Sequence, residues 1–497
     1  MKNKFILVAA LAIGFAGCEP EFENEVNAAY TSGEADFTRY LAVGNSLTAG
    51  YMDGTVCRVG QSYSYPNLLA QQFALVGGGA FTQPSFAEDV NNLGGISGVP
   101  GFGTRLVIDA SQGRPEPIAG TSTITLTPQA QAYNNMGVPG AKSFHLGFAG
   151  YGALNPYFAR HATTPTATIL GDAMTKNPTF FTNWIGSNDV LAYALSGGTQ
   201  ADGVTPAADH NATGNLNPAT YGFNDITNST YFNGVYTNII NTLTVNGAKG
   251  LVCTIPSVTS IPYFTTVKWN PVPLDSNKAT SLNSGFANYN SGLDLAFSNG
   301  LITNAERLAR KIIFSAGSNN PVVIVDNDLT NLSTLGMPSY RMTTANDLIV
   351  LTAGSFIGTI VNNNINLVNG LSVPLANKYV LTANEKLKVA NATAAYNTSI
   401  VAIAATKNLA VADMNAIMNK LVAGLQVEGN SIYTANYFSG TSTEGQVLFS
   451  LDGVHPNARG YAVIANEIIK VINSKFKSNL PLHNPIYFPG ISILPTN

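Results

Sequence analysis

Three residues of the chain carry the functional groups of a serine nucleophile and its base. Ser46 follows a short apolar run, residues 39–44, that ends at a glycine. Asp452 and His455 are three residues apart, immediately before a helical pattern. A serine hydroxyl is a poor nucleophile near neutral pH, so it needs an imidazole that takes its proton, and the imidazole needs an acceptor that fixes its tautomer. Asp452 and His455 are close enough in the chain for that pairing.

Two other segments offer hydrogen-bond donors for a developing negative charge. Asn188 lies in Gly-Ser-Asn-Asp, residues 186–189, at the end of an apolar run, and Gly140 ends the segment 135–140. Acyl transfer passes through a tetrahedral oxyanion, which preorganised N–H donors stabilise by several kcal/mol. Asn188 has a side-chain amide, and the N–H of Gly140 has no side chain in its way.

Each of these segments also has a simpler structural interpretation. Ser46 could cap the helix that follows the apolar run, and the N–H groups at that helix start could equally serve an oxyanion. Asp452 could cap the last helix and leave His455 on the surface. Asn188 and Gly140 could belong to ordinary turns, where their residue types are favoured. None of the four segments is specific alone.

The remaining polar and aromatic candidates are weaker. Asp189 is expected to cap the following helix and not to act as an acid. His145 follows the Gly140 segment closely and could line a cleft, but a solvated loop position is the expectation. The three histidines His161, His210 and His483 have no aspartate at a helpful spacing. Five aromatic residues could form a platform for an acyl chain or a sugar, although core positions are commoner: Tyr231, Phe232, Tyr263, Phe264 and Trp269.

Short apolar runs alternate with helical patterns along the chain. Besides residues 39–44, apolar runs typical of buried strands are found at 180–186, 250–255, 322–325 and 409–412. A capping box of Thr382 and Glu385 opens a helix over residues 382–405. Its expected apolar face is Leu387, Ala390, Ala394, Asn397, Val401 and Ala404. Pro456 precedes a second helix over 457–473, with an apolar face of Tyr461, Ile464, Ala465, Ile468 and Ile472. Strands that alternate with helices predict a doubly wound parallel sheet.

One large domain is expected over residues 37–476, followed by a tail at 477–497. Long Gly-, Asn-, Ser- and Thr-rich segments at about 53–130, 196–232 and 258–300 are interpreted as surface insertions, because loops tolerate extra length at small entropic cost. No internal repeat is visible.

The beginning of the chain has the layout of an export signal. Two lysines precede an apolar run, which is too short to span a bilayer comfortably, and small residues lead to Cys18. Residues 1–17 resemble a bacterial lipoprotein signal peptide, in which Cys18 is lipidated and becomes the first mature residue. The alternative is an ordinary signal peptide with an incidental cysteine. The acidic residues 18–36 predict a flexible tether. We therefore expect an exported protein anchored to the bacterial envelope by acyl chains, facing the periplasm or the cell surface.

The composition narrows the classes of partner. The net charge is −3 and only 11% of residues are charged, so no basic face for nucleic acid is predicted. The five histidines are scattered and form no Cys/His pattern with metal-ligand spacing. Cys57 and Cys253 could pair in an exported protein, but their separation establishes no disulfide. The sequence leaves the oligomeric state open.

Together the four segments resemble the ordered sequence blocks of the SGNH, or GDSL-like, hydrolases. The matching segments are residues 44–48, 135–140, 186–189 and 452–455. The resemblance implies a flavodoxin-like three-layer α/β/α sandwich with a mostly parallel sheet and long insertions. It makes Ser46 the nucleophile, His455 the general base and acid, and Asp452 its orienter. It also assigns the oxyanion hole to the Ser46 N–H, the Gly140 N–H and the Asn188 side chain.

The chain departs from the family pattern in two ways. The usual Gly-Asp-Ser-Leu is Gly-Asn45-Ser-Leu here, and we expect activity to survive because that Asp is not the triad acid. About 260 residues separate Asn188 from Asp452, which is well beyond a compact family member, and the insertions are expected to build the substrate cleft.

The predicted reaction is two-step hydrolysis of a carboxylic ester without a metal or organic cofactor. The substrate is expected to be a small-molecule, lipid or glycan ester. Two substrates fit: a lipid-like acyl ester, which the resemblance to large bacterial GDSL-like lipases and acylhydrolases favours slightly, or an acetyl group on a polysaccharide. A different class also remains open, in which a non-catalytic surface lipoprotein binds glycan or protein on a hydrolase fold.

Overall fold

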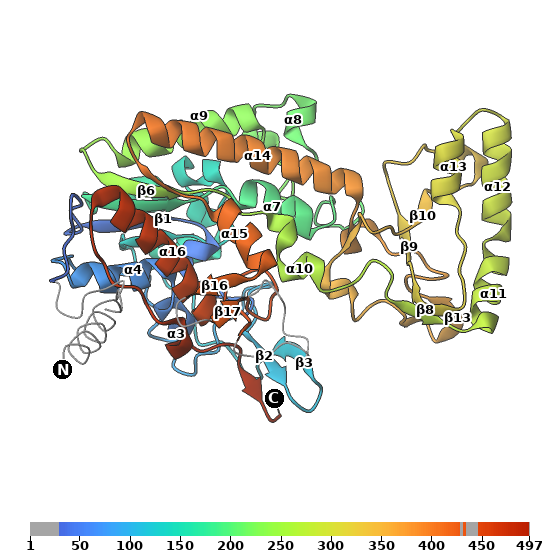
Figure 1. Ribbon diagram of the computed structural model, residues 1–497, viewed down its shortest axis with the longest axis horizontal. Coiled ribbons are helices and arrows are strands. Elements are labelled where there is room, and N and C mark those ends of the chain that lie inside the picture. The colour runs from blue at the N-terminus through green and yellow to red at the C-terminus, as the bar shows by residue number, and fades with distance from the viewer. Residues whose placement is uncertain (1–28, 428–430, 434–445, 497) are drawn as a thin grey trace, which may run out of the picture.

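The centre of the molecule is a sheet of five parallel strands in the order β15-β6-β5-β1-β4 (Figure 1). The computed structural model describes residues 29–427, 431–433 and 446–496. The five strands are β1 (Tyr40–Gly44), β4 (Asn135–Gly137), β5 (Phe180–Trp184), β6 (Lys249–Cys253) and β15 (Ala410–Ala412). The predicted α/β class with a parallel sheet is confirmed.

Helices cover both faces of this sheet because successive strand residues point to opposite sides. Tyr40 and Ala42 of β1 pack into a cluster with α4 (Tyr65–Ala74) and α16 (Ala458–Phe476). Leu41 and Val43 pack into a second cluster with α9 (Ser229–Leu243) and α14 (Ala383–Thr406). Figure 1 shows α9 and α14 on one side of the sheet and α4 and α16 on the other. The sheet is therefore buried on both faces, as its near-continuous apolar strands require.

The set of strands in the central sheet differs from the expectation in two segments. The apolar run at 322–325 forms β9 (Val323–Val325), which pairs antiparallel with β10 (Tyr340–Met342) outside the central sheet. The edge position belongs to β4, within a segment whose composition suggests only a turn. β4 has only three residues, and its pairing depends on partners that are distant in sequence, such as the Ala42 N–H, which donates to the Asn134 carbonyl at 2.8 Å. Hydropathy cannot reveal such a strand.

The two predicted helices are present. The capping box of α14 forms, with the Thr382 N–H donating to Glu385 Oε2 at 2.8 Å. The predicted apolar face of α14 is wrong, because Leu387 is 58% exposed and Val401 46% exposed. The larger side chains Val389, Tyr396 and Ile400 decide which face is buried in this alanine-rich helix. Helix α16 follows Asn457, whose side chain accepts from the Gly460 N–H at 2.9 Å. Its predicted face is buried except for Ile464, which is half-buried.

An outer lobe, residues 270–370, extends from this body on the right of Figure 1. The predicted insertion 258–300 covers only its first part. The helices of the lobe are α11 (Ser276–Gly285), α12 (Ala287–Ser298) and α13 (Asn304–Arg310). Its strands, besides β9 and β10, are β7 (Val272–Leu274), β8 (Gly317–Asn320), β12 (Ile360–Val361) and β13 (Asn364–Val368). Strand β11 (Leu348–Ile349) pairs with β14 (Val380–Leu381), just before α14.

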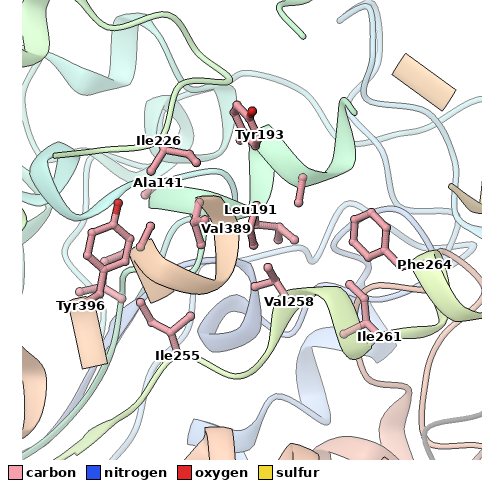
Figure 2. Close-up of a cluster of buried hydrophobic side chains, with 14 of the residues drawn as sticks. Ala141, Leu191, Tyr193, Ile226, Ile255, Val258, Ile261, Phe264, Val389 and Tyr396 are labelled. Carbon is pink, nitrogen blue, oxygen red and sulfur yellow. The ribbon is translucent and has the colours of Figure 1, made fainter. Parts of the chain in front are cut away.

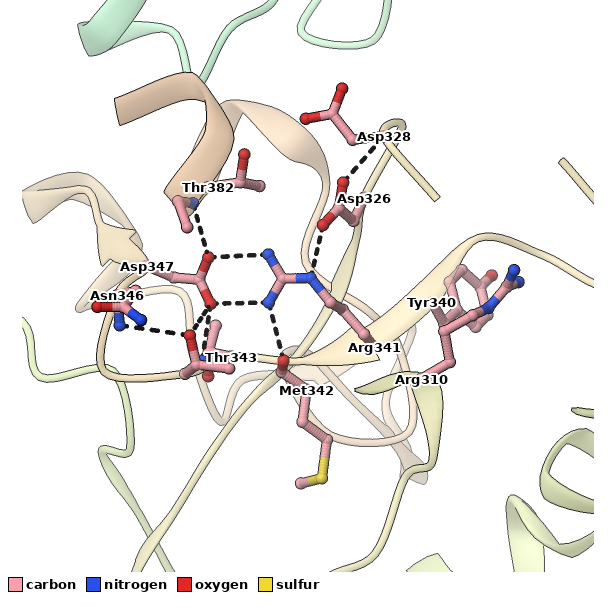
Figure 3. A network of polar contacts seen from close by, with 12 residues as sticks. Arg310, Asp326, Asp328, Tyr340, Arg341, Met342, Thr343, Asn346, Asp347 and Thr382 are labelled. Carbon is pink, nitrogen blue, oxygen red and sulfur yellow. Dashed lines mark hydrogen bonds and ion pairs between the residues drawn. The ribbon is translucent and has the colours of Figure 1, made fainter. Parts of the chain in front are cut away.

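An ion-pair network joins the lobe to the start of α14 (Figure 3). Both terminal nitrogens of Arg341 donate to Asp347, at 2.7 and 2.8 Å, and its Nε donates to Asp326 at 2.5 Å. Asp347 also accepts from the Ala383 N–H at 3.1 Å. These hydrogen bonds outweigh burial and hold the pKa of Asp347 below its ordinary value.

The remaining elements are short. The helices are α2 (Ser46–Ala49), α3 (Arg58–Ser62), α5 (Pro156–His161), α6 (Ile169–Met174), α7 (Asn188–Leu195), α8 (His210–Thr213), α10 (Pro262–Thr265) and α15 (Met414–Ala423). The strands are β2 (Leu106–Asp109), β3 (Arg114–Pro117), β14 (Val380–Leu381), β16 (Leu425–Val427), β17 (Ser431–Tyr433) and β18 (Ile493–Leu494).

Both predicted terminal segments make contacts with the body where they are described. The predicted signal peptide, Cys18 and residues 18–28 of the tether lie outside the described residues. The remainder of the predicted flexible tether, residues 29–36, is bonded to the body, because the Glu34 N–H donates to the Phe476 carbonyl at 2.6 Å. The tail carries β18, which pairs with β2. None of the helices in the described ranges is long and apolar enough to cross a membrane. Cys57 and Cys253 are both buried and free, so they form no disulfide.

Candidate active site

The structure brings Ser46, His455 and Asp452 into one hydrogen-bonded chain. Ser46 Oγ lies 2.8 Å from His455 Nε2, and His455 Nδ1 lies 2.9 Å from Asp452 Oδ2. These separations are those of a nucleophile, its base and the acceptor that orients the base. The side chains of His455 and Asp452 are 14% and 13% exposed, so these three residues are largely shielded from solvent but still accessible.

Asp452 is held in place by several donors. Its Oδ1 accepts from the N–H groups of Val454 and His455, each at 2.8 Å, and from Ser450 Oγ at 3.0 Å. Its Oδ2 also accepts from the Gly54 N–H at 3.1 Å. Burial favours the neutral acid, but the nearby His455 and these hydrogen bonds outweigh it and keep the pKa of Asp452 below the ordinary value. Asp452 is therefore a carboxylate across the neutral range.

The position of Ser46 follows from the close approach of β1 and α2. A Cβ atom on Gly44 would stand 2.6 Å from the Trp184 carbonyl oxygen, so only glycine fits at the end of β1. Asn45 is buried, and its Oδ1 accepts from the Leu47 N–H at 3.1 Å. Asn45, and not Ser46, is thus the residue that caps α2. Because α2 is only one turn long, no long helix stands behind Ser46 to stabilise a negative charge. The hydrogen-bond donor at this position is the N–H of Ser46 itself.

Gly140 occupies a tight turn beside Ser46. The Ala141 N–H donates to the Val138 carbonyl at 3.1 Å, with Pro139 and Gly140 at the central positions. Gly140 has φ +80°, the backbone region that the third residue of a type II turn needs and that glycine adopts without strain. Asn188 Nδ2 donates to the Ala141 carbonyl at 2.9 Å, which ties this turn to the start of α7.

The backbone N–H groups of Ser46 and Gly140 have no hydrogen-bond partner within the described residues. The side-chain amide of Asn188 has two N–H donors, and its bond to the Ala141 carbonyl uses only one of them. Gly140 and Asn188 line the same cavity as Ser46. The three residues predicted for an oxyanion hole therefore lie together, with donors to spare.

Sequence reasoning missed Asn155, which orients the Gly140 peptide. Asn155 Nδ2 donates to the Pro139 carbonyl at 2.8 Å, while its Oδ1 caps α5 by accepting from the Tyr157 N–H at 3.0 Å. In a planar trans peptide the carbonyl of Pro139 and the N–H of Gly140 point in opposite directions. Asn155 therefore fixes the direction of the Gly140 N–H. An Asn-Pro pair at a helix start was the only signal for it in the sequence.

Two cavities meet at the triad and share Ser46, Asn188 and His455 in their walls. The first is narrow, with about 100 Å³ open to the centres of water molecules, and lies between α15 and α16. The second is a broad cleft of about 730 Å³ by the same measure. Tyr51, Asn155 and Asp452 are among the residues that line the broad cleft.

The other histidines have different surroundings. The expectation that His145 is solvated is wrong, since it stacks on Tyr151 with ring centroids 4.3 Å apart and lines the broad cleft. Burial and the charge of Lys142 lower the pKa of His145 to about 4, so it is neutral near pH 7. His161 is buried, and burial lowers its pKa to about 3. His483 bonds the Leu68 carbonyl at 3.1 Å, a structural role.

His210 has no aspartate at a helpful spacing in the sequence, but the fold gives it one. Its Nε2 lies 2.9 Å from Asp225 Oδ2, fifteen residues away along the chain. Asp189 has a structural role, but it is not the predicted helix cap. It is buried and accepts from the N–H and the Oγ of Ser143, each at 2.8 Å.

The aromatic candidates divide between core and cleft. Phe232 and Phe264 are buried in the core, and Figure 2 shows Phe264 beside Ile261. Tyr263 lines the broad cleft. Tyr231 lines a separate surface pocket. The Trp269 carbonyl accepts a hydrogen bond from Thr343 Oγ1.

Within the described ranges, no group of three or more His, Cys, Asp or Glu side chains is placed to hold a metal ion. Comparison of the chain with family models, curated proteins and solved structures found no match. The geometry of the site is therefore the basis on which a function is assigned.

Proposed function

We propose that this protein is a serine hydrolase of carboxylic esters, with Ser46 as nucleophile, His455 as general base and acid, and Asp452 as the residue that orients His455. The observation that carries the proposal is the continuous chain from Ser46 Oγ to His455 at 2.8 Å and from His455 to Asp452 at 2.9 Å, where two cavities meet.

The topology supports a flavodoxin-like fold of the SGNH type. Numbered by chain position, the sheet order from β4 to β15 is 2-1-3-4-5, which is the flavodoxin-like order. In such sheets ligands bind at the carboxyl ends of the strands where the order reverses, here between β1 and β5. Ser46 follows β1 and Asn188 follows β5, while Gly140 follows the neighbouring β4.

Hydrolysis proceeds in two steps on these residues. His455 Nε2 takes the Ser46 proton as Oγ attacks the ester carbonyl, and Asp452 stabilises the imidazolium that results. The oxyanion accepts hydrogen bonds from the N–H groups of Ser46 and Gly140 and from the Asn188 amide. The alcohol leaves with the proton from His455. Water, activated by His455, then releases the acid from Ser46.

The replacement of the usual family Asp by Asn45 fits this proposal. Asn45 is buried and provides the capping oxygen for α2, which an aspartate would provide equally. A neutral amide avoids a second buried charge close to Ser46.

We also propose that Cys18 carries acyl chains that anchor the enzyme to the bacterial envelope.

A fluorophosphonate probe tests the proposed chemistry, because it reacts only with an activated serine. The wild-type protein is expected to be labelled and to hydrolyse p-nitrophenyl acetate, and Ser46→Ala is expected to do neither while keeping its circular dichroism spectrum and melting temperature. Equal labelling of both proteins, or of neither, would support the non-catalytic binding lipoprotein instead.

A further inference from the structure

The narrow cavity beside Ser46 has walls of apolar side chains. From α15 come Ile417, Met418 and Leu421, and from α16 come Val463 and Ile464. Ile417, Met418 and Ile464 are half-buried although their neighbours on the inner faces of these helices are covered. Partly exposed apolar side chains that face one another across a cavity leave surface that a chain of methylene groups would cover.

The cavity continues into the core of the molecule. Leu191 of α7, Val258 and Ile261 also line it, and Figure 2 shows these three side chains close together in the hydrophobic cluster. Among the described residues that line it there is no Asp, Glu, Lys or Arg side chain. An acetyl group needs no such space, and a sugar or another polar alcohol would lose its hydrogen bonds to water there.

The broad cleft on the other side of Ser46 has a different character. Tyr51, Tyr157 and Tyr263 line it together with Asn155 and His145. It is wide and offers hydrogen-bonding groups and aromatic faces, which suit a bulky polar alcohol. Gly140 lines this cleft and not the narrow cavity, so the oxyanion hole opens beside it.

We propose that the narrow cavity between α15 and α16 binds the acyl chain of the substrate, which makes the substrate a fatty-acyl ester of a polar alcohol. This inference rests on the proposed function. The bond that breaks joins the carbonyl carbon at Ser46 to the alcohol oxygen in the broad cleft. That oxygen takes the proton from His455 and leaves through the cleft, while the acyl chain stays in the cavity until water displaces Ser46 and releases the fatty acid.

Two ester series separate the acyl side from the alcohol side. In the first, p-nitrophenol is kept and the acyl group is lengthened from acetyl to dodecanoyl. Each methylene that enters the cavity is expected to raise kcat/KM about fourfold, until the cavity is full. In the second series the acyl group is octanoyl and the alcohol changes from ethanol to glycerol to a methyl glycoside.

Met418→Trp should fill the cavity from α15, and Ile464→Trp should fill it from α16. Either variant is expected to lower the ratio of octanoate to acetate kcat/KM by about tenfold or more. Val422→Trp is the matched control, because Val422 lies on the same helix as Met418, is 55% exposed and does not line the cavity. Its octanoate to acetate ratio should equal that of the wild type.

A flat acyl series in the wild type would overturn the inference, and so would an unchanged ratio in both tryptophan variants. The inference would also be overturned if kcat/KM fell along the second series, from ethanol to glycerol to the methyl glycoside. That fall would place the alcohol in the narrow cavity. These results differ from a failure of the proposed function, in which Ser46 would resist the fluorophosphonate and p-nitrophenyl acetate would not be hydrolysed.

Discussion

The molecule contains two His–Asp pairs with the same 2.9 Å separation, and their surroundings differ. His455 points its Nε2 at Ser46 and its Nδ1 at Asp452. His210 is turned the other way, with Nε2 at Asp225 and Nδ1 3.0 Å from Thr213 Oγ1. Its ring stacks on Tyr221 with centroids 3.9 Å apart.

The partners of the two carboxylates also differ. Asp225 accepts from the Ala208 N–H at 2.8 Å and from the Gly222 N–H and Gln200 Nε2, each at 2.6 Å. Its hydrogen bonds therefore connect distant parts of the segment 196–232. Burial raises its pKa, but these bonds outweigh burial and leave the pKa below the ordinary value. A His–Asp pair therefore does not define an active site. A hydroxyl at a cavity, with spare N–H donors beside it, makes the difference at His455.

Removing the active-site imidazole should give the largest effect. His455→Ala is expected to lower kcat for p-nitrophenyl acetate by about 10⁴-fold, because Ser46 then has no base. Stopped-flow or continuous absorbance assays give kcat, and thermal denaturation checks the fold. Retention of more than a tenth of the activity would remove His455 from the mechanism.

Asn155 offers a sharper test of the active-site side of the comparison. Asn155→Asp keeps the oxygen that caps α5 but loses the donor to the Pro139 carbonyl. With the Gly140 N–H less well oriented, kcat should fall by about 10- to 100-fold, with KM and melting temperature little changed. A marked fall in melting temperature together with the loss of kcat would show that Asn155 is only a helix cap.

His210→Ala should have the opposite profile to His455→Ala. Asp225 and Thr213 each lose a partner, so the free energy of unfolding is expected to fall by about 1–3 kcal/mol. The kcat should stay at the wild-type value because His210 lines none of the cavities at Ser46. Urea denaturation and the ester assay measure the two quantities. A large fall in kcat in a folded His210→Ala protein would mean that the second pair takes part in the chemistry.

The smallest effect concerns Asp53, which lies behind the active pair. Its Oδ1 accepts from the Leu451 N–H at 2.9 Å, and its N–H donates to Ser450 Oγ at 3.0 Å. Burial, aided by the charge of Asp452 and opposed by the Leu451 bond and Arg105, raises the pKa of Asp53 to about 7.

The stability that Asp53 contributes should therefore fall with rising pH. The folded protein keeps a proton that the unfolded chain releases near the ordinary pKa of 3.8, so this contribution is complete below that pH and is lost as the pH rises to about 7. Melting temperatures of the wild type and Asp53→Asn between pH 4 and pH 8 test this. The wild type should lose stability relative to the variant as the pH rises, and a gain would contradict the assignment.

The sequence predicted those parts of the site that local chemistry determines. Ser46 follows a strand that hydropathy reveals, and Asp452 and His455 share one turn, so their pairing needs little of the fold. Gly140 could be placed because its segment resembles a family block, and the structure adds that it has a positive φ in a Pro-Gly turn. Four of the five strands of the central sheet were recognisable as apolar runs, whereas the fifth run, residues 322–325, forms a strand outside that sheet.

What the sequence did not predict depends on contacts between distant segments. Asp225 and His210 are too far apart in sequence to suggest a pair. Asn155 acts through a carbonyl sixteen residues away. The edge strand β4 has three residues, so only its pairing with β1 identifies it. The narrow cavity forms between α15 and α16, whose relative position no local pattern contains.

Mapping the adduct of a fluorophosphonate by peptide mass spectrometry tests the central claim most directly, since it asks which hydroxyl is activated. We predict a single adduct on the peptide that contains Ser46, and none on the peptide that contains Thr213 beside the second His–Asp pair. An adduct at Thr213 or at any other hydroxyl with Ser46 unmodified would contradict the proposed role of Ser46.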